Sequence, residues 1–269
     1  MTRTLKRPLL ARLAAAMAYA AIAGCPIAIA HANPSAAKAT AETIRVELPS
    51  GSTQVDIYWP DASSPAPLVI VAHGFSRHRR NMSGWGKHLA SQGLVAAVPD
   101  LPAWSDQVRN GRFLSELRDY LCAGEHWKPR IDASRVGLMG FSAGGLASLL
   151  CAADSPGLAI WVGLDPVDRN GIGAKAAPRV QCRAVVLTAE PSSCNANGNA
   201  RSIMTALPQC QHFTVTGAAH TDAEWPTGRI AEVVCGRSTE ERRNEFRRRA
   251  TEALLKALEG RPCGGFKTD

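Results

Sequence analysis

Residues 135–153 read RVGLMGFSAGGLASLLCAA, and this stretch decides the fold. A short apolar run at 135–139 leads into Gly140-Phe141-Ser142-Ala143-Gly144, and small and apolar residues follow up to position 153. The pentapeptide matches G-x-S-x-G, in which a serine is held on a sharp turn between a strand and a helix. Glycines are needed on both sides because a side chain there would collide with neighbouring backbone. The stretch therefore predicts a strand, a nucleophile elbow at Ser142 and a helix over 143–153, whereas a glycine-rich turn without chemistry is the weaker interpretation.

After an opening hairpin formed by 43–48 and 53–59, short strands, of which 68–72 and 94–98 carry no charge, alternate with helices on both sides of this turn. The expected strands span 43–48, 53–59, 68–72, 94–98, 158–164, 183–188 and 212–215, and the expected helices span 83–91, 112–126 and a C-terminal stretch that Ser238 and Glu241 could cap. Uncharged strands separated by helices indicate a parallel sheet with helices on its faces. With the elbow, this pattern predicts an α/β-hydrolase fold, a mostly parallel central sheet flanked by helices. The longest irregular stretches, 165–181 and 191–198, are the expected walls of an active site.

The first 32 residues have the organisation of a secretory signal peptide. Basic residues precede an apolar run at 13–29, which ends in A-H-A at 30–32. We expect cleavage after Ala32. A membrane anchor is the competing interpretation, but the run is short, rich in alanine and interrupted by glycine and proline. A further alternative is the segment I-A-G-C at 22–25, which resembles a bacterial lipoprotein box and would make Cys25 a lipidated N-terminus.

The basic charge of the chain does not call for a nucleic-acid partner. The formal net charge is +8, and it falls to about +4 without the four basic residues of the signal segment. The remaining excess lies largely in arginines of the expected C-terminal helix, whose apolar residues keep to another face: Arg242, Arg243, Arg247, Arg248 and Arg249. We interpret these arginines as a solvated helix face.

The cysteines predict disulfides rather than a metal site. No pair has the C-x-x-C spacing of zinc or redox sites, and disulfides are common in exported proteins. Of the eight cysteines, Cys25 leaves with the signal peptide, and an odd number remain: Cys122, Cys151, Cys182, Cys194, Cys210, Cys235 and Cys263. At least one thiol is then expected to be free or paired between molecules. The sequence does not predict which cysteines pair.

Two backbone amides are predicted to form an oxyanion hole. His73-Gly74-Phe75 follows the expected strand 68–72, where this fold carries half of that hole. We expect the N–H of Phe75 to be one donor and the N–H of Ala143, directly after the nucleophile, to be the other. We interpret His73 as a structural residue, because its place before the loop suits orientation better than proton transfer.

The general base is expected late in the chain, because the order in this fold is serine, acid, histidine. His220 lies in GAAHTD at 217–222, just beyond the last expected strand. Small neighbours there allow a loop to bring the imidazole beside the serine. His212 is the competing candidate, but it begins a strand and would be fixed by the sheet. We therefore predict His220 as the base.

Three carboxylates compete for the role of the acid. Asp165 and Asp168 lie in GLDPVD at 163–168, whereas Glu190 follows the next strand, where most members of this fold carry their acid. The acid must lie at the carboxyl edge of the sheet with its reach fixed by the preceding strand. Asp165 meets this condition directly, whereas the following Pro191 and a longer side chain alter the reach of Glu190. We favour Asp165 and keep Glu190 and Asp168 as alternatives.

These motifs together resemble a known family. The His-Gly-Phe loop, the Gly-x-Ser-x-Gly-Gly elbow and GLDPVD at 163–168 look like plant chlorophyllases and their bacterial relatives, over roughly positions 65–225. That family is similar in fold to dienelactone hydrolases and bacterial polyester hydrolases. Its triad aspartate belongs to a Gly-Ile-Asp-Pro-Val segment, so the resemblance implies Asp165. The chain departs from chlorophyllases at Ala143, where they carry arginine, and at Leu164, where they carry isoleucine.

The predictions combine into an exported serine esterase. We expect a signal peptide at 1–32, a flexible segment at 33–42, one α/β-hydrolase domain at 43–260 and a tail at 261–269. Ser142 attacks a carboxylic ester, His220 transfers the proton, Asp165 orients His220, and Phe75 and Ala143 hold the oxyanion. We expect no metal or organic cofactor, a small-molecule or polymeric ester as substrate, no nucleic acid, no membrane span in the mature protein, and a monomer.

Two other functions remain open at this point. An acyltransferase would use the same triad, because the motif does not tell whether water or an alcohol releases the acyl group. A non-catalytic binding protein on the same scaffold is disfavoured, because the serine, histidine, acid and oxyanion loop are all present in order. The sequence predicts export to the periplasm or beyond, but not the natural substrate or its acyl chain length.

Overall fold

The computed structural model describes residues 40–259. These residues belong to one of two units of the chain, Pro34–Asp269. The predicted signal peptide at 1–32, with Cys25 and Ala32, lies outside the described residues, as do the tail at 261–269 and Cys263. Within 40–259, no helix combines the length and the apolar character needed to cross a membrane.

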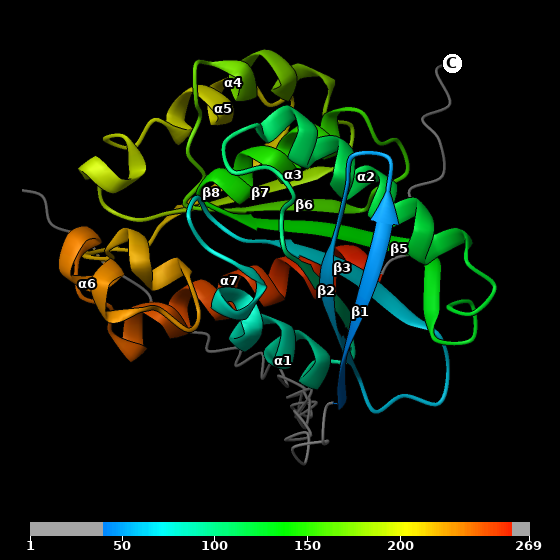
Figure 1. The fold of residues 1–269 in the computed structure, drawn as a ribbon. Coiled ribbons are helices and arrows are strands. Elements are labelled where there is room, and N and C mark those ends of the chain that lie inside the picture. The colour runs from blue at the N-terminus through cyan, green and yellow to red at the C-terminus, as the bar shows by residue number, and fades with distance from the viewer. Residues whose placement is uncertain (1–39, 260–269) are drawn as a thin grey trace, which may run out of the picture. The chain divides into compact units, whose positions relative to one another are not determined.

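The described residues contain an eight-stranded sheet (Figure 1). Its strands are β1 (Thr40–Leu48), β2 (Gly51–Trp59), β3 (Ala66–Ala72), β4 (Val95–Pro99), β5 (Ile131–Phe141), β6 (Ile160–Leu164), β7 (Arg183–Thr188) and β8 (Cys210–Thr214). Their order in the sheet is β1-β2-β4-β3-β5-β6-β7-β8. β2 pairs antiparallel with β1 and with β4, and all other neighbours are parallel. The predicted mostly parallel sheet is therefore confirmed.

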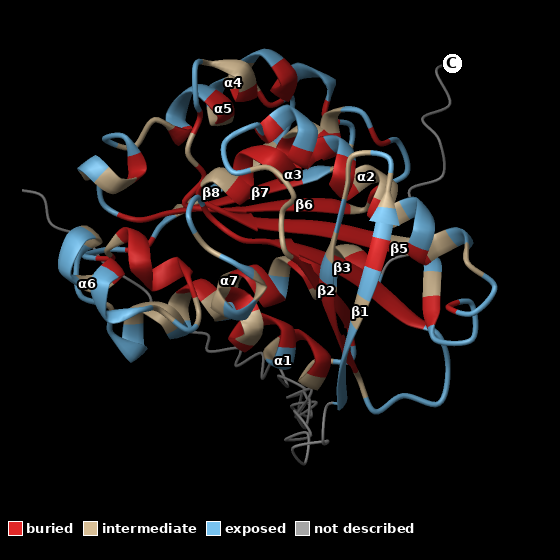
Figure 2. Ribbon diagram, viewed as in Figure 1, coloured by how far each residue is buried: buried red, intermediate tan, exposed pale blue. Residues whose placement is uncertain are grey.

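Helices cover both faces of the sheet (Figure 1). One face carries α1 (Ser83–Ser91) and α7 (Glu240–Leu258), and the other carries α2 (Gln107–Ala123) and α3 (Ala143–Ala153). β3 shows why the buried parts of the central strands are uncharged: Leu68 and Ile70 pack with α2 and α3, whereas Val69 and Val71 pack with α1 and α7. Successive side chains of a strand point to opposite faces, so a strand covered on both sides must be apolar throughout. The sheet is accordingly buried along its centre (Figure 2).

Several element boundaries differ from the prediction. α2 begins at Gln107, five positions before the expected start, because the Asp106 carboxylate caps it by accepting the N–H of Arg109 at 2.9 Å. α7 is capped by Thr239, and the predicted cap formed by Ser238 and Glu241 is wrong. β1 begins at Thr40, because its backbone stays paired with β2 up to that position. The last three residues of the predicted flexible segment 33–42 are therefore part of a strand.

Three short helices were not predicted, and the first of them lies in the stretch 165–181 that was expected to be irregular. They are α4 (Ile172–Ala176), α5 (Ala200–Ala206) and α6 (Arg229–Cys235), and each has at most seven residues. Such short elements contain too few turns for an apolar periodicity to stand out. The last residue of α6, Cys235, forms a disulfide with Cys194 in the loop after β7. Among the described cysteines the thiols of four remain free: Cys122, Cys151, Cys182 and Cys210.

Candidate active site

Ser142 lies on the turn that joins β5 to α3, with φ 53° and ψ −120°. Two flanking glycines make this turn possible. A Cβ atom on Gly140 would lie 2.3 Å from the carbonyl oxygen of Gly144, and one on Gly144 would lie 2.2 Å from the carbonyl oxygen of His73. Both distances are far below contact, so the helix can approach the strands only with glycine at these positions. The serine hydroxyl is thereby presented above the carboxyl edge of the sheet.

His220 reaches the serine from a position 78 residues further along the chain. It begins the 3-10 helix η4 (His220–Ala223), and its Nε2 lies 2.9 Å from the Ser142 Oγ. Its Nδ1 lies 2.6 Å from Asp165 Oδ2. Because a carboxylate accepts the hydrogen on Nδ1, Nε2 is left to accept the serine proton. The ring also lies against Phe141, at 4.7 Å between centroids, which limits its rotation.

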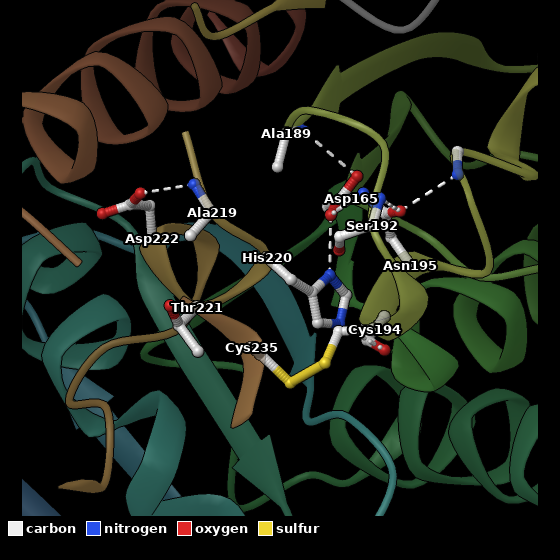
Figure 3. A network of polar contacts seen from close by, with 12 residues as sticks. Asp165, Ala189, Ser192, Cys194, Asn195, Ala219, His220, Thr221, Asp222 and Cys235 are labelled. Carbon is white, nitrogen blue, oxygen red and sulfur yellow. Dashed lines mark hydrogen bonds and ion pairs between the residues drawn. A yellow bond between two sulfur atoms is a disulfide. The ribbon is translucent and has the colours of Figure 1, made fainter. Parts of the chain in front are cut away.

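Asp165 follows β6 and is almost completely buried, with 1% of its surface exposed. Its φ of 42° lies in the left-handed region, and its N–H donates to the Leu187 carbonyl of β7. Its Oδ1 accepts the N–H of Ala189 at 3.1 Å, and its Oδ2 accepts from Asn195 Nδ2 at 3.0 Å as well as from His220 (Figure 3). Three donors from three different segments therefore hold the plane of this carboxylate in place.

The other candidates lie elsewhere. Glu190 is exposed, and its Oε1 accepts the N–H of Gly217 at 3.1 Å. The Asp168 carboxylate caps α4 by accepting two backbone amides, at 2.8 and 3.0 Å. His212 lies on the edge strand β8 with its Nε2 2.9 Å from Thr188 Oγ1. Of the predicted acids, the structure brings Asp165 to His220. Among residues 40–259, no group of three or more His, Cys, Asp or Glu side chains could hold a metal ion.

The two predicted oxyanion donors lie near Ser142, because Ala143 follows it in the chain and Phe75 lines a cleft together with it. Ala143 is the first residue of α3, where the helix dipole favours negative charge. Within the described part of the chain, neither its N–H nor that of Phe75 donates a hydrogen bond, and both residues line a cavity of about 270 Å³. His73 supports the loop: its Nδ1 donates to the Gly74 carbonyl and its Nε2 accepts the N–H of Leu101, both at 2.9 Å. Burial lowers the pKa of His73, which keeps it neutral.

A larger cleft of about 530 Å³ opens over Ser142 and His220. One wall is the loop after β3, with Phe75, and the other is α6, with Ile230 and Val234. These three side chains are 47%, 83% and 67% exposed. Sequence reasoning missed α6, because its apolar side chains face solvent and the cleft rather than the core. The cleft therefore offers an apolar surface directly beside the serine.

Buried charges hold the histidine loop in place. The Asp222 carboxylate is buried and accepts the backbone N–H groups of Ala219 and Thr239, each at 2.8 Å. It also accepts from Arg242 Nε at 2.7 Å. The interpretation of the C-terminal arginines as a solvated face is therefore wrong for Arg242, which anchors the loop of His220 to α7.

Glu224 directly follows η4 and is fully buried. Its Oε1 accepts from Arg77 Nε at 2.7 Å, and its Oε2 has no hydrogen-bond partner among the described residues. Burial raises the pKa of Glu224 to about 7, although the neighbouring Arg77 opposes this. Arg77 also lines the cleft above Ser142. The ion pair between Glu224 and Arg77 thus connects the segment that carries His220 with the wall of the cleft.

Comparisons with known proteins agree with this geometry. The chain is 33% identical over 137 residues to bis(hydroxyethyl) terephthalate hydrolase from Streptomyces coelicolor, a match that covers 50% of this chain and 43% of that protein. It is 26% identical over 147 residues to chlorophyllase-2 from Arabidopsis thaliana, covering 49% and 45% of the two chains. These matches span less than half the length of each relative.

The fold has a solved counterpart in the dienelactone hydrolase from Anabaena variabilis. The TM-score is 0.66 at 16% sequence identity, and the alignment covers 82% of this chain and 99% of that one. This likeness confirms the predicted α/β-hydrolase fold. Residues 15–231 match the PETase family, which is described as PET hydrolase-like. The resemblance to chlorophyllases, dienelactone hydrolases and polyester hydrolases is thus confirmed, and the chain belongs to the PET hydrolase-like family.

Proposed function

We propose that this chain is a serine hydrolase that cleaves carboxylic esters through an acyl-enzyme intermediate. One observation carries the proposal. The hydroxyl of Ser142, the imidazole of His220 and the carboxylate of Asp165 form a continuous hydrogen-bonded series at 2.9 and 2.6 Å. The backbone amides of Phe75 and Ala143 have no acceptor among the described residues, and both residues line one cavity. Nucleophile, base, acid and oxyanion donors are the four parts that acyl transfer needs.

Acylation begins when His220 Nε2 accepts the proton of Ser142 as its oxygen attacks the ester carbonyl carbon. The carbonyl oxygen gains negative charge and accepts hydrogen bonds from Phe75 and Ala143. Asp165 stabilises the imidazolium that forms and keeps its ring oriented. His220 then returns the proton to the leaving alkoxide, and the alcohol departs.

Deacylation repeats these steps with water. His220 takes a proton from the water molecule, the resulting hydroxide attacks the acyl-enzyme, and the acid product leaves as Ser142 regains its proton. The same two amides hold the second tetrahedral intermediate. All proton transfers therefore run through one imidazole.

The proposed substrate is an ester with an apolar group next to the scissile bond. The cleft of about 530 Å³ is lined by Phe75, Ile230 and Val234, which would remove such a group from water. A relative is named bis(hydroxyethyl) terephthalate hydrolase, after an ester of this kind. The cleft is open along α6, so a small molecule and a segment of a polyester are both included in the proposal.

We also propose that the protein is exported and monomeric. The disulfide between Cys194 and Cys235 supports export, because disulfides persist in oxidising compartments. The N-terminal segment has the organisation of a signal peptide, with cleavage after Ala32 as the proposed processing and lipidation at Cys25 as the alternative. The mass of the purified mature protein distinguishes the two.

The nucleophile is tested with a fluorophosphonate probe, followed by peptide mapping of the adduct. We expect one adduct, on Ser142, and none in Ser142→Ala. The same variant should lose turnover of p-nitrophenyl acetate and keep the circular dichroism spectrum of the wild type. Full turnover by a folded Ser142→Ala protein would refute the proposed function.

A further inference from the structure

Asn195, in the loop after β7, is a second buried partner of Asp165. Its side-chain Nδ2 lies 3.0 Å from Asp165 Oδ2 and 2.9 Å from the Glu190 carbonyl oxygen. Its Oδ1 accepts the backbone N–H of Ser192 at 2.8 Å and of Gly198 at 3.0 Å. Only 1% of Asn195 is exposed. The two backbone donors fix the direction of the amide, so its N–H groups must face the carboxylate.

This amide completes the hydrogen bonding of the acid. Asp165 Oδ2 accepts from His220 on one side and from Asn195 on the other, while Oδ1 accepts from Ala189 (Figure 3). A hydrogen bond to the charged form of a carboxyl group favours ionisation, and opposed donors keep its plane from rotating. Asn195 is therefore placed to hold the direction of the Asp165 carboxylate.

The loop that carries Asn195 is itself fastened to the histidine segment. Cys194, the preceding residue, is disulfide-bonded to Cys235 at the end of α6, and α6 follows the segment of His220. Thr221, next to the histidine, donates its hydroxyl to the Gly236 carbonyl, one residue beyond that cysteine. The disulfide and this hydrogen bond therefore connect the loop that carries Asn195 to the segment that carries His220.

We propose that Asn195 is a positioning residue of the triad, which holds the carboxylate of Asp165 directed at His220. This inference rests on the proposed function, since it assigns a role within the same site. Asn195→Ala removes one charge-assisted hydrogen bond and should lower kcat on the order of ten- to a hundredfold, with KM within about twofold. The loss falls on kcat because the imidazolium needs its partner mainly in the transition state.

Asn195→Asp gives the sharper test, because the side chain keeps its size. A carboxylate would then face Asp165 Oδ2 at about 3 Å, where two negative charges repel each other. Where both carboxyl groups are ionised, the added charge favours the protonated imidazole, so the acid limb of the pH profile of kcat/KM should move to higher pH. A residue that only stabilises the loop would change stability without moving this limb.

Asn199 provides the matched control. Its amide also bridges two loops, accepting the N–H of Asp168 at 2.9 Å and donating to the Asp168 carbonyl at 2.6 Å, and neither of these hydrogen bonds involves Asp165. Asn199→Ala and Asn199→Asp should leave the midpoint of the acid limb unchanged. An equal shift in the Asn199 variants, or an unmoved limb in Asn195→Asp with kcat of Asn195→Ala within twofold of the wild type, would overturn the proposal.

A second readout separates this inference from the proposed function. The titration of the His220 imidazole can be followed by NMR in selectively labelled protein, with His220→Gln for assignment, and needs no turnover. We expect a higher midpoint in Asn195→Asp than in the wild type. If the wild type neither hydrolyses esters nor reacts with the fluorophosphonate, the proposed function fails, and the imidazole titration still decides the role of Asn195. If Asn195→Ala does not fold, the isosteric Asn195→Asp carries the test.

Discussion

Replacing Glu224 by glutamine should make the protein more stable above neutral pH. The Glu224 carboxyl is fully buried, one of its oxygens has no hydrogen-bond partner among the described residues, and burial raises its pKa from 4.5 to about 7. The folded protein therefore binds this proton more tightly than the unfolded chain does. Between pH 4.5 and 7 the free energy of unfolding falls as the pH rises, because the folded state must give up a proton that the unfolded chain has already lost.

The magnitude follows from the two pKa values. At about 1.4 kcal/mol per pH unit, a rise from 4.5 to about 7 corresponds to about 3 kcal/mol, present below pH 4.5 and lost by about pH 8. Glutamine imitates the neutral carboxyl at every pH. The Glu224→Gln variant should therefore match the wild type near pH 4.5 and exceed it by up to about 3 kcal/mol at pH 8. The pKa of about 7 already includes the opposing effect of the Arg77 guanidinium, so this ion pair does not reduce the gain further.

The assay is urea denaturation of both proteins at pH 4.5, 6 and 8, because the difference between them cancels the other titrating groups. Glu252→Gln is the control, since Glu252 is 70% exposed and its replacement should leave the pH dependence of stability unchanged. A Glu224→Gln variant that is less stable than the wild type at pH 8 would contradict the claim that burial of the ionised Glu224 destabilises the fold. That outcome would mean that the ion pair with Arg77 outweighs the burial of the carboxylate.

Three further predictions concern the acid, the elbow and the disulfide. Asp165→Asn should lower kcat/KM for p-nitrophenyl acetate by about 10⁴, whereas Glu190→Gln should stay within about threefold of the wild type; the reverse order would place the acid after β7. Gly144→Ala forces a Cβ to within 2.2 Å of a backbone oxygen, and thermal denaturation should show a loss of about 3 kcal/mol. A loss below about 1 kcal/mol would mean that α3 moves away freely. Replacing Cys194 and Cys235 together by serine opens a link between positions 41 residues apart and should cost about 4 kcal/mol, and an unchanged urea midpoint would contradict this.

The parts of the site that could be predicted are those fixed by local geometry and chain order. Ser142 lies on a turn that only glycines at 140 and 144 allow, so a few residues of sequence are enough to predict the turn. His220 follows from the order of the triad along the chain, and Asp165 from its place after a buried strand. The structure brings these three side chains together at hydrogen-bond distances. Their catalytic roles stay proposals until the variants are measured.

What could not be predicted depends on contacts between distant segments. The first turn of α2 buries the polar side chains of Gln107 and Asn110. The Asn110 amide accepts a hydrogen bond from the N–H of Ala103 and donates one to the Ala103 carbonyl. Apolar periodicity therefore begins only at Phe113, which explains the late predicted start. α6 was missed for the opposite reason, since its aliphatic side chains are exposed. The pairing of Cys194 with Cys235 requires the fold itself, because spacing along the chain does not specify it.

The position of Asp165 after β6 explains which side chain the loop after β7 contributes to the site. β6 is the direct neighbour of β5, which carries the nucleophile, so an acid after β6 lies one strand closer to Ser142 than an acid after β7. Asp165 takes up a left-handed backbone conformation there, and its N–H bonds to the carbonyl of Leu187 on β7. The loop after β7 therefore does not need to contribute the acid, and Glu190 in that loop is exposed. The loop instead supplies the Asn195 amide behind the carboxylate, and a disulfide holds that loop against the helix beyond the histidine. Asp165 and its partner Asn195 thus come from the segments that follow two adjacent strands, and variants of either should act on the same imidazole.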